Sequence, residues 1–106
     1  MPVTSIENLD EYHKVVNSPT PAIIQFWATW SGPCRIISPA FEKHSDKPEN
    51  AKLKFYKLDT DAVPDATNEA GIRTVPTFIV FHNGNKVDEM TGTNSTVLAN
   101  LIAKYV

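Results

Sequence analysis

The hydrophobic positions along this chain change their spacing several times, and each change predicts a new element. Apolar residues at helical spacing follow Asn8, which can cap a helix with Glu11 at the third position in a capping-box arrangement, and predict a helix over roughly residues 8–17. The mostly apolar run Ala22–Trp27 predicts a strand that is covered on both faces, with Gln25 as its one polar interruption.

The rest of the chain alternates in the same way. Helical spacing continues after the 27–34 segment to about Asp46, and Pro39 inside this helix predicts a kink. Asn83-Gly84 between two apolar runs is a strong hairpin signal. The remaining elements are a strand at Leu53–Leu58, a helix at Ala62–Ala70, strands at Thr77–Phe81 and Lys86–Thr91, and a last helix with Leu98, Leu101, Ile102 and Tyr105 on one face. With a strand before the first helix, the order βαβαβαββα predicts an α/β fold.

Length and composition narrow the class of protein. A chain of 106 residues predicts a single domain over residues 1–106, since domains of about 100–150 residues are the commonest size. The net charge of −2, with scattered basic residues, gives no long-range field for nucleic acid. No apolar stretch approaches the roughly 18 residues of a membrane span, and Met1–Ser5 lacks the features of a signal peptide. We therefore expect a cytoplasmic protein with no membrane segment.

Cysteine use points to the same compartment. Cys34 is the one cysteine, so no intrachain disulfide can form, which is usual where thiols stay reduced. We expect a monomer, or a Cys34-linked dimer if this thiol reacts. One cysteine and three widely separated histidines (His13, His44 and His82) give no metal-ligand spacing, so no metal site is expected.

Residues 27–34 carry the most informative motif, Trp-Ala-Thr-Trp-Ser-Gly-Pro-Cys. A cysteine in place of Ser31 would complete Trp-Cys-Gly-Pro-Cys, the active-site motif of thioredoxins. Further elements occur at the spacing of that family: Phe26-Trp27-Ala28, Pro39, Val75-Pro76-Thr77, Asn83-Gly84 and Gly92. Essentially the whole chain therefore resembles a cytosolic-type thioredoxin. The resemblance implies the thioredoxin fold, a central mixed five-stranded sheet flanked by four helices.

The chemistry of that family needs two thiols at a helix start. A thiolate attacks a substrate disulfide, and a second thiol then resolves the mixed disulfide. The resemblance places Ser31 at the attacking position and Cys34 at the resolving one. A serine hydroxyl is too weak an acid to attack without a base, and no motif places a histidine beside it. We expect Ser31 to cap the helix, and Cys34 to be a small buried residue with limited access.

The resemblance also implies a surface that binds substrate. Its residues are Trp30, Gly32, Pro33, Val75, Pro76 and Gly92. Val75-Pro76 resembles the family's cis-proline loop, in which the backbone of the residue before proline pairs with an extended substrate. Simpler interpretations are that Trp30 is a core aromatic and Gly92 a turn glycine. Trp27 is expected to pack beside the site.

Gln25 is a second departure from the family pattern. Thioredoxins commonly carry a buried aspartate at this position, thought to accept the proton of the resolving thiol, with a lysine on the neighbouring strand. Lys57 matches that lysine. Gln25 cannot change its protonation state; it is either a substituted relay residue or a neutral side chain satisfied by hydrogen bonds. Lys57 is either its partner or a strand-end lysine with its ammonium group in solvent.

The resemblance implies a general protein disulfide oxidoreductase, here disabled or impaired by Ser31, and the intact surface around Ser31 favours a Cys-to-Ser substitution. Its implied partners are disulfide-containing proteins and an NADPH-dependent flavoprotein thioredoxin reductase, and no cofactor is expected on the chain itself. The alternative is a natural redox-inactive thioredoxin-like module that binds proteins. A monothiol glutathione-linked enzyme is disfavoured, because such enzymes usually keep the first cysteine of the motif.

Overall fold

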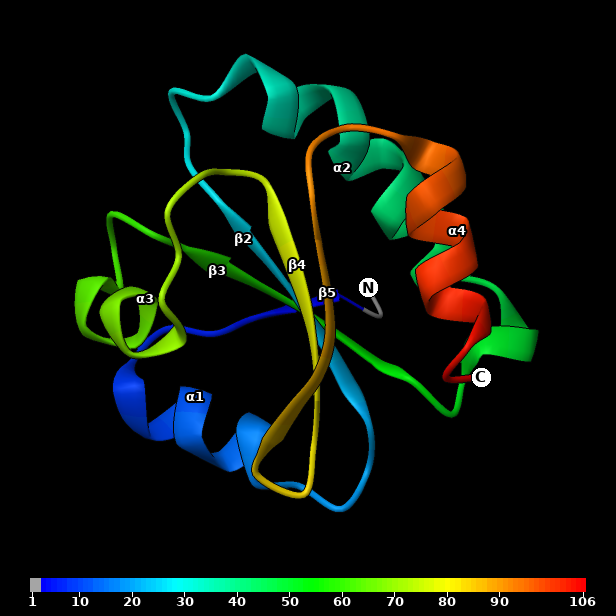
Figure 1. Ribbon diagram of the computed structural model, residues 1–106, viewed down its shortest axis with the longest axis horizontal. Coiled ribbons are helices and arrows are strands. Elements are labelled where there is room, and N and C mark those ends of the chain that lie inside the picture. Colours follow the sequence, from blue (N-terminus) through cyan, green and yellow to red (C-terminus); the bar gives the residue numbers. More distant parts are fainter. Residues whose placement is uncertain (1–2) are drawn as a thin grey trace.

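The computed structural model describes residues 3–106. Met1 and Pro2, the first two residues of the Met1–Ser5 segment that lacks signal-peptide features, lie outside the described residues. Within residues 3–106 the elements follow the predicted order (Figure 1). The strands are β1 (Val3–Ser5), β2 (Ala22–Trp27), β3 (Lys54–Asp59), β4 (Thr77–His82) and β5 (Asn85–Thr91). The α-helices are α1 (Leu9–Val16), α2 (Gly32–Ser45), α3 (Pro64–Ala70) and α4 (Ser95–Ala103), and a short 3₁₀ helix, η1, covers Pro48–Asn50. No helix in this range is both long and apolar enough to span a membrane.

Local hydrogen bonds explain where the elements begin. Asn8 caps α1 as predicted, since its side-chain oxygen accepts a hydrogen bond from the Glu11 N–H at 2.9 Å. The predicted start of β3 at Leu53 is one residue early, because the Leu53 N–H donates to the carbonyl of Asn50 in η1. The predicted start of α3 at Ala62 is also early. Pro64 takes the first helical position, where its missing N–H costs no helical hydrogen bond.

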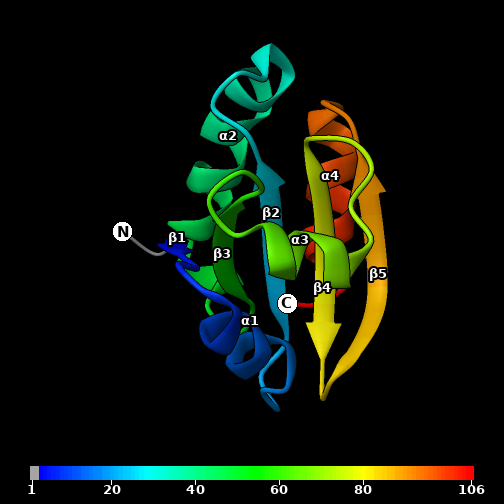
Figure 2. The same cartoon turned by 90° about the vertical axis from the view of Figure 1, so that its left-hand side faces the viewer.

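The order of strands in the sheet is β1-β3-β2-β4-β5, and Figure 2 shows them side by side in this order. β1, β3 and β2 run parallel, whereas β4 is antiparallel to β2 and β5 is antiparallel to β4. The carboxyl ends of β2, β3 and β5 therefore meet the amino end of β4 at one edge. The register at this edge places Trp27 beside Asp59 and Thr77 beside both Phe26 and Thr91.

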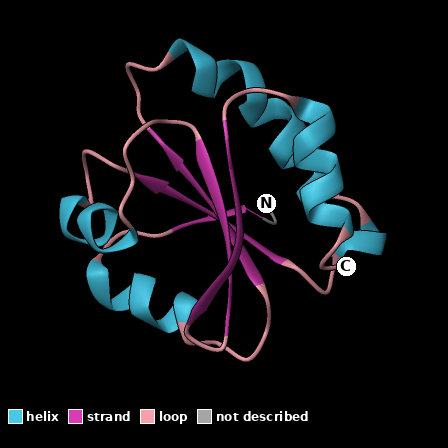
Figure 3. Cartoon of the chain, viewed as in Figure 1, coloured by secondary structure: helices cyan, strands magenta, loops and turns pink. Residues whose placement is uncertain are grey.

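Helices cover both faces of the sheet and bury β2 and β4 between two apolar cores (Figures 1 and 3). On one face, α2 and α4 contribute Ile37, Phe41, Leu98, Leu101 and Ile102. On the other, α1 and α3 contribute Tyr12 and Ala66, which pack with Ile24, Phe26, Ile79 and other strand residues. Burial on both sides explains why the runs in β2 and β4 are nearly continuous in apolar residues.

Pro39 lies inside α2, where its ring removes one helical hydrogen bond.

Tyr12 gives the fold a dependence on alkaline pH. Its buried ring lies edge-on to Phe81 with the ring centroids 5.9 Å apart. Burial, and after it the charge of Glu69, raises the pKa of Tyr12 from 10.0 to about 12. The unfolded chain therefore loses this phenol proton more readily than the folded chain. The stability that Tyr12 contributes is complete below pH 10 and is lost as the pH rises from 10 towards 12.

We predict that Tyr12→Phe removes this part of the pH dependence. In the parent chain the phenol lowers the free energy of unfolding by up to about 1.4 kcal/mol per pH unit in that window. Urea titrations of both chains at pH 8, 10 and 11 measure the difference. If the two chains lose stability equally between pH 10 and 11, the assignment to Tyr12 is wrong.

Candidate functional site

Ser31 begins the helix that carries the candidate site. It is 3% exposed, and its hydroxyl oxygen accepts a hydrogen bond from the Cys34 backbone N–H at 3.3 Å. This is N-cap geometry, and it confirms the predicted capping role of Ser31. Gly32 and Pro33 form the exposed first positions of α2. Pro33 has no N–H there to leave without a helical partner.

Cys34 lies in the first turn of α2 and is 2% exposed. Its backbone carbonyl accepts a hydrogen bond from the Ser38 hydroxyl at 2.7 Å, and the Ser38 oxygen accepts one from Gln25 Nε2 at 2.8 Å. Gln25 is also 2% exposed, so this bond replaces one that it loses to water. The Nε2 group of Gln25 thus has the hydrogen-bond partner that a buried neutral side chain needs. Sequence analysis missed Ser38, although serine within a helix often bonds the carbonyl four residues earlier.

A cavity of about 120 Å³ lies beside this hydrogen-bond chain and is lined by Gln25, Trp27, Ser38, Glu42 and Lys57. Lys57 lies directly opposite Gln25 in the pairing of β2 with β3. It is half-buried, and its Nζ lies 5.9 Å from the centroid of the Trp27 ring, within the range of a cation–π contact. The Lys57 ammonium group therefore lies over the Trp27 ring. Trp27 packs beside the site as expected, and its Nε1 is buried without a hydrogen-bond partner in residues 3–106.

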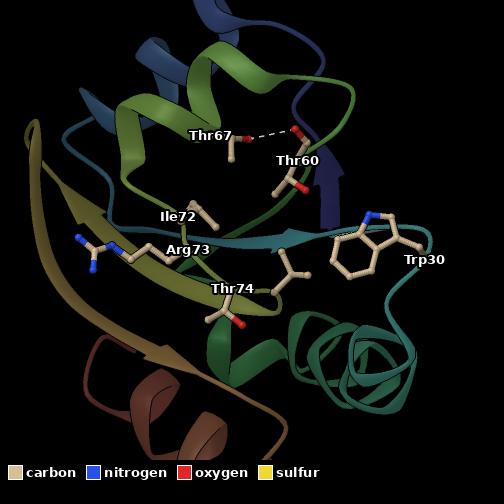
Figure 4. A pocket seen from close by; sticks show the side chains of 7 residues that line it. Trp30, Thr60, Thr67, Ile72, Arg73 and Thr74 are labelled. Atoms are coloured by element: carbon tan, nitrogen blue, oxygen red, sulfur yellow. Dashed lines mark hydrogen bonds between the residues drawn. The ribbon is translucent and has the colours of Figure 1, made fainter.

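A second hollow, of about 150 Å³, lies on the solvent side (Figure 4). We call it the groove; Trp30, Thr60, Thr67, Ile72, Arg73, Thr74 and Val75 line it. Trp30 is 69% exposed, so it is not a core aromatic. Its Nε1 donates a hydrogen bond to Asp61 Oδ2 at 3.0 Å. Figure 4 shows the Arg73 side chain extending away from Trp30.

Sequence analysis missed Asp61 and the groove threonines Thr60, Thr67 and Thr74. A signal for Asp61 was present, because it follows the end of a strand predicted next to the strand that leads to Trp30. Carboxyl ends of parallel strands meet at one edge of a sheet, which brings the residues after them together.

The loop before β4 forms the other wall of the groove. The Val75–Pro76 peptide bond is cis, as the resemblance implied. The Pro76 carbonyl accepts a hydrogen bond from the Gly92 N–H at 3.1 Å, which joins these two predicted surface residues. Gly92 has φ of 95°, a conformation that favours glycine by itself, and a Cβ at this position would meet no atom within 4 Å. A turn role accounts for this glycine without reference to a partner.

The histidines take part in other contacts. His13 Nε2 lies 2.7 Å from a carboxylate oxygen of Glu69, and His82 Nε2 lies 2.8 Å from the Pro19 carbonyl oxygen. Across residues 3–106, no histidine ring bonds the Ser31 hydroxyl, and no group of three or more His, Cys, Asp or Glu side chains could hold a metal ion. The structure thus gathers the predicted residues into two places: Gln25 and Lys57 beneath Cys34, and Trp30 and Val75 along the groove. Gly32 and Pro33 line neither hollow.

Comparisons with known proteins agree with this geometry. The thioredoxin family model matches residues 3–104. Thioredoxin from Coprinus comatus is 50% identical over 102 residues, covering 96% of this chain and 96% of that protein. The solved structure of Malassezia sympodialis thioredoxin is 41% identical with a TM-score of 0.94, covering 97% of this chain and 90% of that one. The solved structure of Plasmodium falciparum thioredoxin is 34% identical with a TM-score of 0.91, covering 97% of this chain and 99% of that one. The predicted thioredoxin fold is confirmed, and the chain belongs to the thioredoxin family.

Proposed function

We propose that this site is a thioredoxin disulfide-exchange site in which Ser31 occupies the position of the attacking thiol. The observation that carries the proposal is the placement of Ser31 at the N-terminus of α2, with Cys34 one turn on. On this proposal the chain binds disulfide-containing proteins along the groove and does not complete the exchange. The binding surface consists of the groove residues Trp30 and Val75 and, outside the groove, Gly32, Pro33, Pro76 and Gly92.

The balance of the exchange reaction explains why Ser31 blocks it. In a dithiol site the first thiolate attacks one sulfur of the substrate disulfide, and the other substrate sulfur leaves as a thiol. The second thiol then attacks the mixed disulfide, so the substrate is reduced and the site becomes a disulfide. The helix N-terminus favours the attacking anion. Within residues 3–106 no base bonds the Ser31 hydroxyl, and the burial of Cys34 limits its access to a substrate disulfide.

The partners follow from the same proposal. They are disulfide-containing proteins and an NADPH-dependent flavoprotein reductase, with the chain cytoplasmic and monomeric. Gln25 and Lys57 occupy the positions that would serve proton transfer from Cys34. Gln25 cannot take up a proton, so this part of the site is impaired as well.

A second candidate function is a redox-inactive module that binds proteins through the groove. The observation in its favour is the hydrogen-bond chain from Gln25 through Ser38 to the Cys34 carbonyl, which contains no titratable group. Ser31 and Gln25 depart from the dithiol pattern together, and both side chains are satisfied where they lie. Such a site is complete without a second sulfur.

We predict that Ser31→Cys creates insulin-disulfide reductase activity and that the parent chain has none above the rate of dithiothreitol alone. Ser31→Ala is the matched control. It removes the N-cap at a cost of about 1 kcal/mol in the free energy of unfolding and stays inactive. Turbidity from insulin reduction, followed for all three chains, measures the effect.

Two outcomes contradict the proposal. Activity of the parent chain comparable to that of Ser31→Cys means that Ser31 is not at a blocked nucleophile position. An inactive but folded Ser31→Cys chain that still binds reduced insulin B chain favours the redox-inactive module.

A further prediction separates the roles of Gln25 in the Ser31→Cys background. Gln25→Asp places a carboxylate opposite Lys57 and next to Ser38 and should speed the decay of the mixed disulfide near neutral pH. The same change should lower the free energy of unfolding by several kcal/mol, because the carboxylate loses its water.

Gln25→Asn is the control for Gln25→Asp, because it has the same side-chain length without the charge. Stopped-flow decay of the mixed disulfide and urea titration measure rate and stability separately. If the mixed disulfides of the Gln25→Asp and Gln25→Asn chains decay at the same rate, position 25 has no part in proton transfer.

A further inference from the structure

Thr77 is a buried polar residue that bonds to a residue of the groove. It is the first residue of β4 and is 2% exposed. Its hydroxyl donates a hydrogen bond to the backbone carbonyl of Thr74 at 2.7 Å. Thr74 and the next residue, Val75, both line the groove, whereas Thr77 does not. The hydroxyl therefore links the start of β4 to the backbone on the other side of the Val75–Pro76 segment.

The two ends of this hydrogen bond differ in how firmly they are held. Thr77 lies between β2 and β5, opposite Phe26 on one side and Thr91 on the other. Thr74 is exposed in the loop between α3 and β4. A partly buried hydrogen bond from a fixed strand to an exposed loop limits the positions that the loop can take.

Few other bonds constrain the middle of this loop. The Ile72 N–H donates to the Thr67 carbonyl, and the Gly92 N–H donates to the Pro76 carbonyl. These bonds hold the loop at its two ends. Within residues 3–106, the Thr77 hydroxyl makes the one side-chain hydrogen bond to the backbone of residues 73–75.

We propose that Thr77 is a positioning residue for the groove. Its hydroxyl fixes the Thr74 carbonyl and thereby sets the backbone at Val75 against which an extended polypeptide lies. The proposal rests on the proposed function, because it assumes that the groove binds the polypeptide around a disulfide. It predicts that Thr77 affects extended protein substrates and leaves small disulfides unaffected.

The test compares two substrates in the Ser31→Cys background. Insulin presents a disulfide within a polypeptide, whereas hydroxyethyl disulfide has no chain to occupy the groove. Thr77→Val keeps the shape of the side chain and removes the hydroxyl, and Thr77→Ser keeps the hydroxyl. Thr4→Val makes the same change at an exposed position of β1, the edge strand at the other side of the sheet, and serves as the control.

We expect Thr77→Val to lower kcat/KM for insulin about fivefold, the effect of one neutral hydrogen bond, mainly through KM. The value for hydroxyethyl disulfide should stay unchanged. Thr77→Ser and Thr4→Val should match the Ser31→Cys parent with both substrates. An equal loss with both substrates, or no loss with insulin, overturns the proposal, because a purely structural role affects both reactions alike.

Nitrogen-15 NMR relaxation of the Ser31 chain provides a second test that needs no reductase activity. Thr77→Val should lower the backbone order parameters of residues 73–75 and leave those of β2 unchanged, and Thr77→Ser should leave both unchanged. Unchanged order parameters at residues 73–75 overturn the positioning role. If the Ser31→Cys parent fails to reduce insulin, the proposed function falls and the relaxation result alone decides the role of Thr77.

Discussion

The antiparallel pairing of β4 with β2 sets the geometry on which the candidate site depends. Phe26 lies opposite Thr77, so β2 ends where β4 begins. The segment that leads to Ser31 and the loop that contains Val75–Pro76 therefore leave the sheet at the same edge. β5 brings Gly92 to that edge as well, because Thr91 pairs with Thr77. A parallel β4 would have placed its preceding loop at the opposite end of the sheet.

The start of α2 divides the site into two environments. On the core side, a hydrogen-bond chain of neutral groups links Gln25 and Ser38 to the Cys34 carbonyl. The Gln25 amide cannot take up a proton, so Glu42 and Lys57 are the ionisable groups of the adjoining cavity. On the solvent side, exposed Trp30 and the loop before β4 offer a surface without a nucleophile.

Local rules predicted the parts of the structure that local interactions determine. The Asn8 and Ser31 caps, the hairpin at Asn83-Gly84 and the apolar runs of β2 and β4 each follow from neighbouring residues. The predicted starts of β3 and α3 were early because the N–H groups of Leu53 and Ala62 form turns with the preceding residues Asn50 and Asp59. The spacing of apolar residues does not reveal such turns.

The contacts that shape the site lie beyond such rules. The hydrogen bond from Trp30 to Asp61 joins the loops after two strands, and the one from Gln25 to Ser38 joins a strand to a helix. Neither can be located before the strand order and the rotation of α2 are known. The approach of Glu42 to Lys57 in one cavity depends on the same packing. Sequence analysis could therefore name residues of the site through the family resemblance, whereas their neighbours had to come from the fold.

The local role of Ser31 explains how α2 begins at this position without a thiolate. Serine is among the best N-cap residues, and here its hydroxyl satisfies the Cys34 N–H that the start of a helix leaves without a partner. The hydroxyl therefore uses the same helix terminus that would stabilise an attacking thiolate. For folding, the free N–H groups at the start of α2 need hydrogen-bond acceptors, and the Ser31 hydroxyl is one such acceptor. For disulfide exchange, the same helix terminus would have to stabilise a thiolate, and a serine provides no anion for it to stabilise.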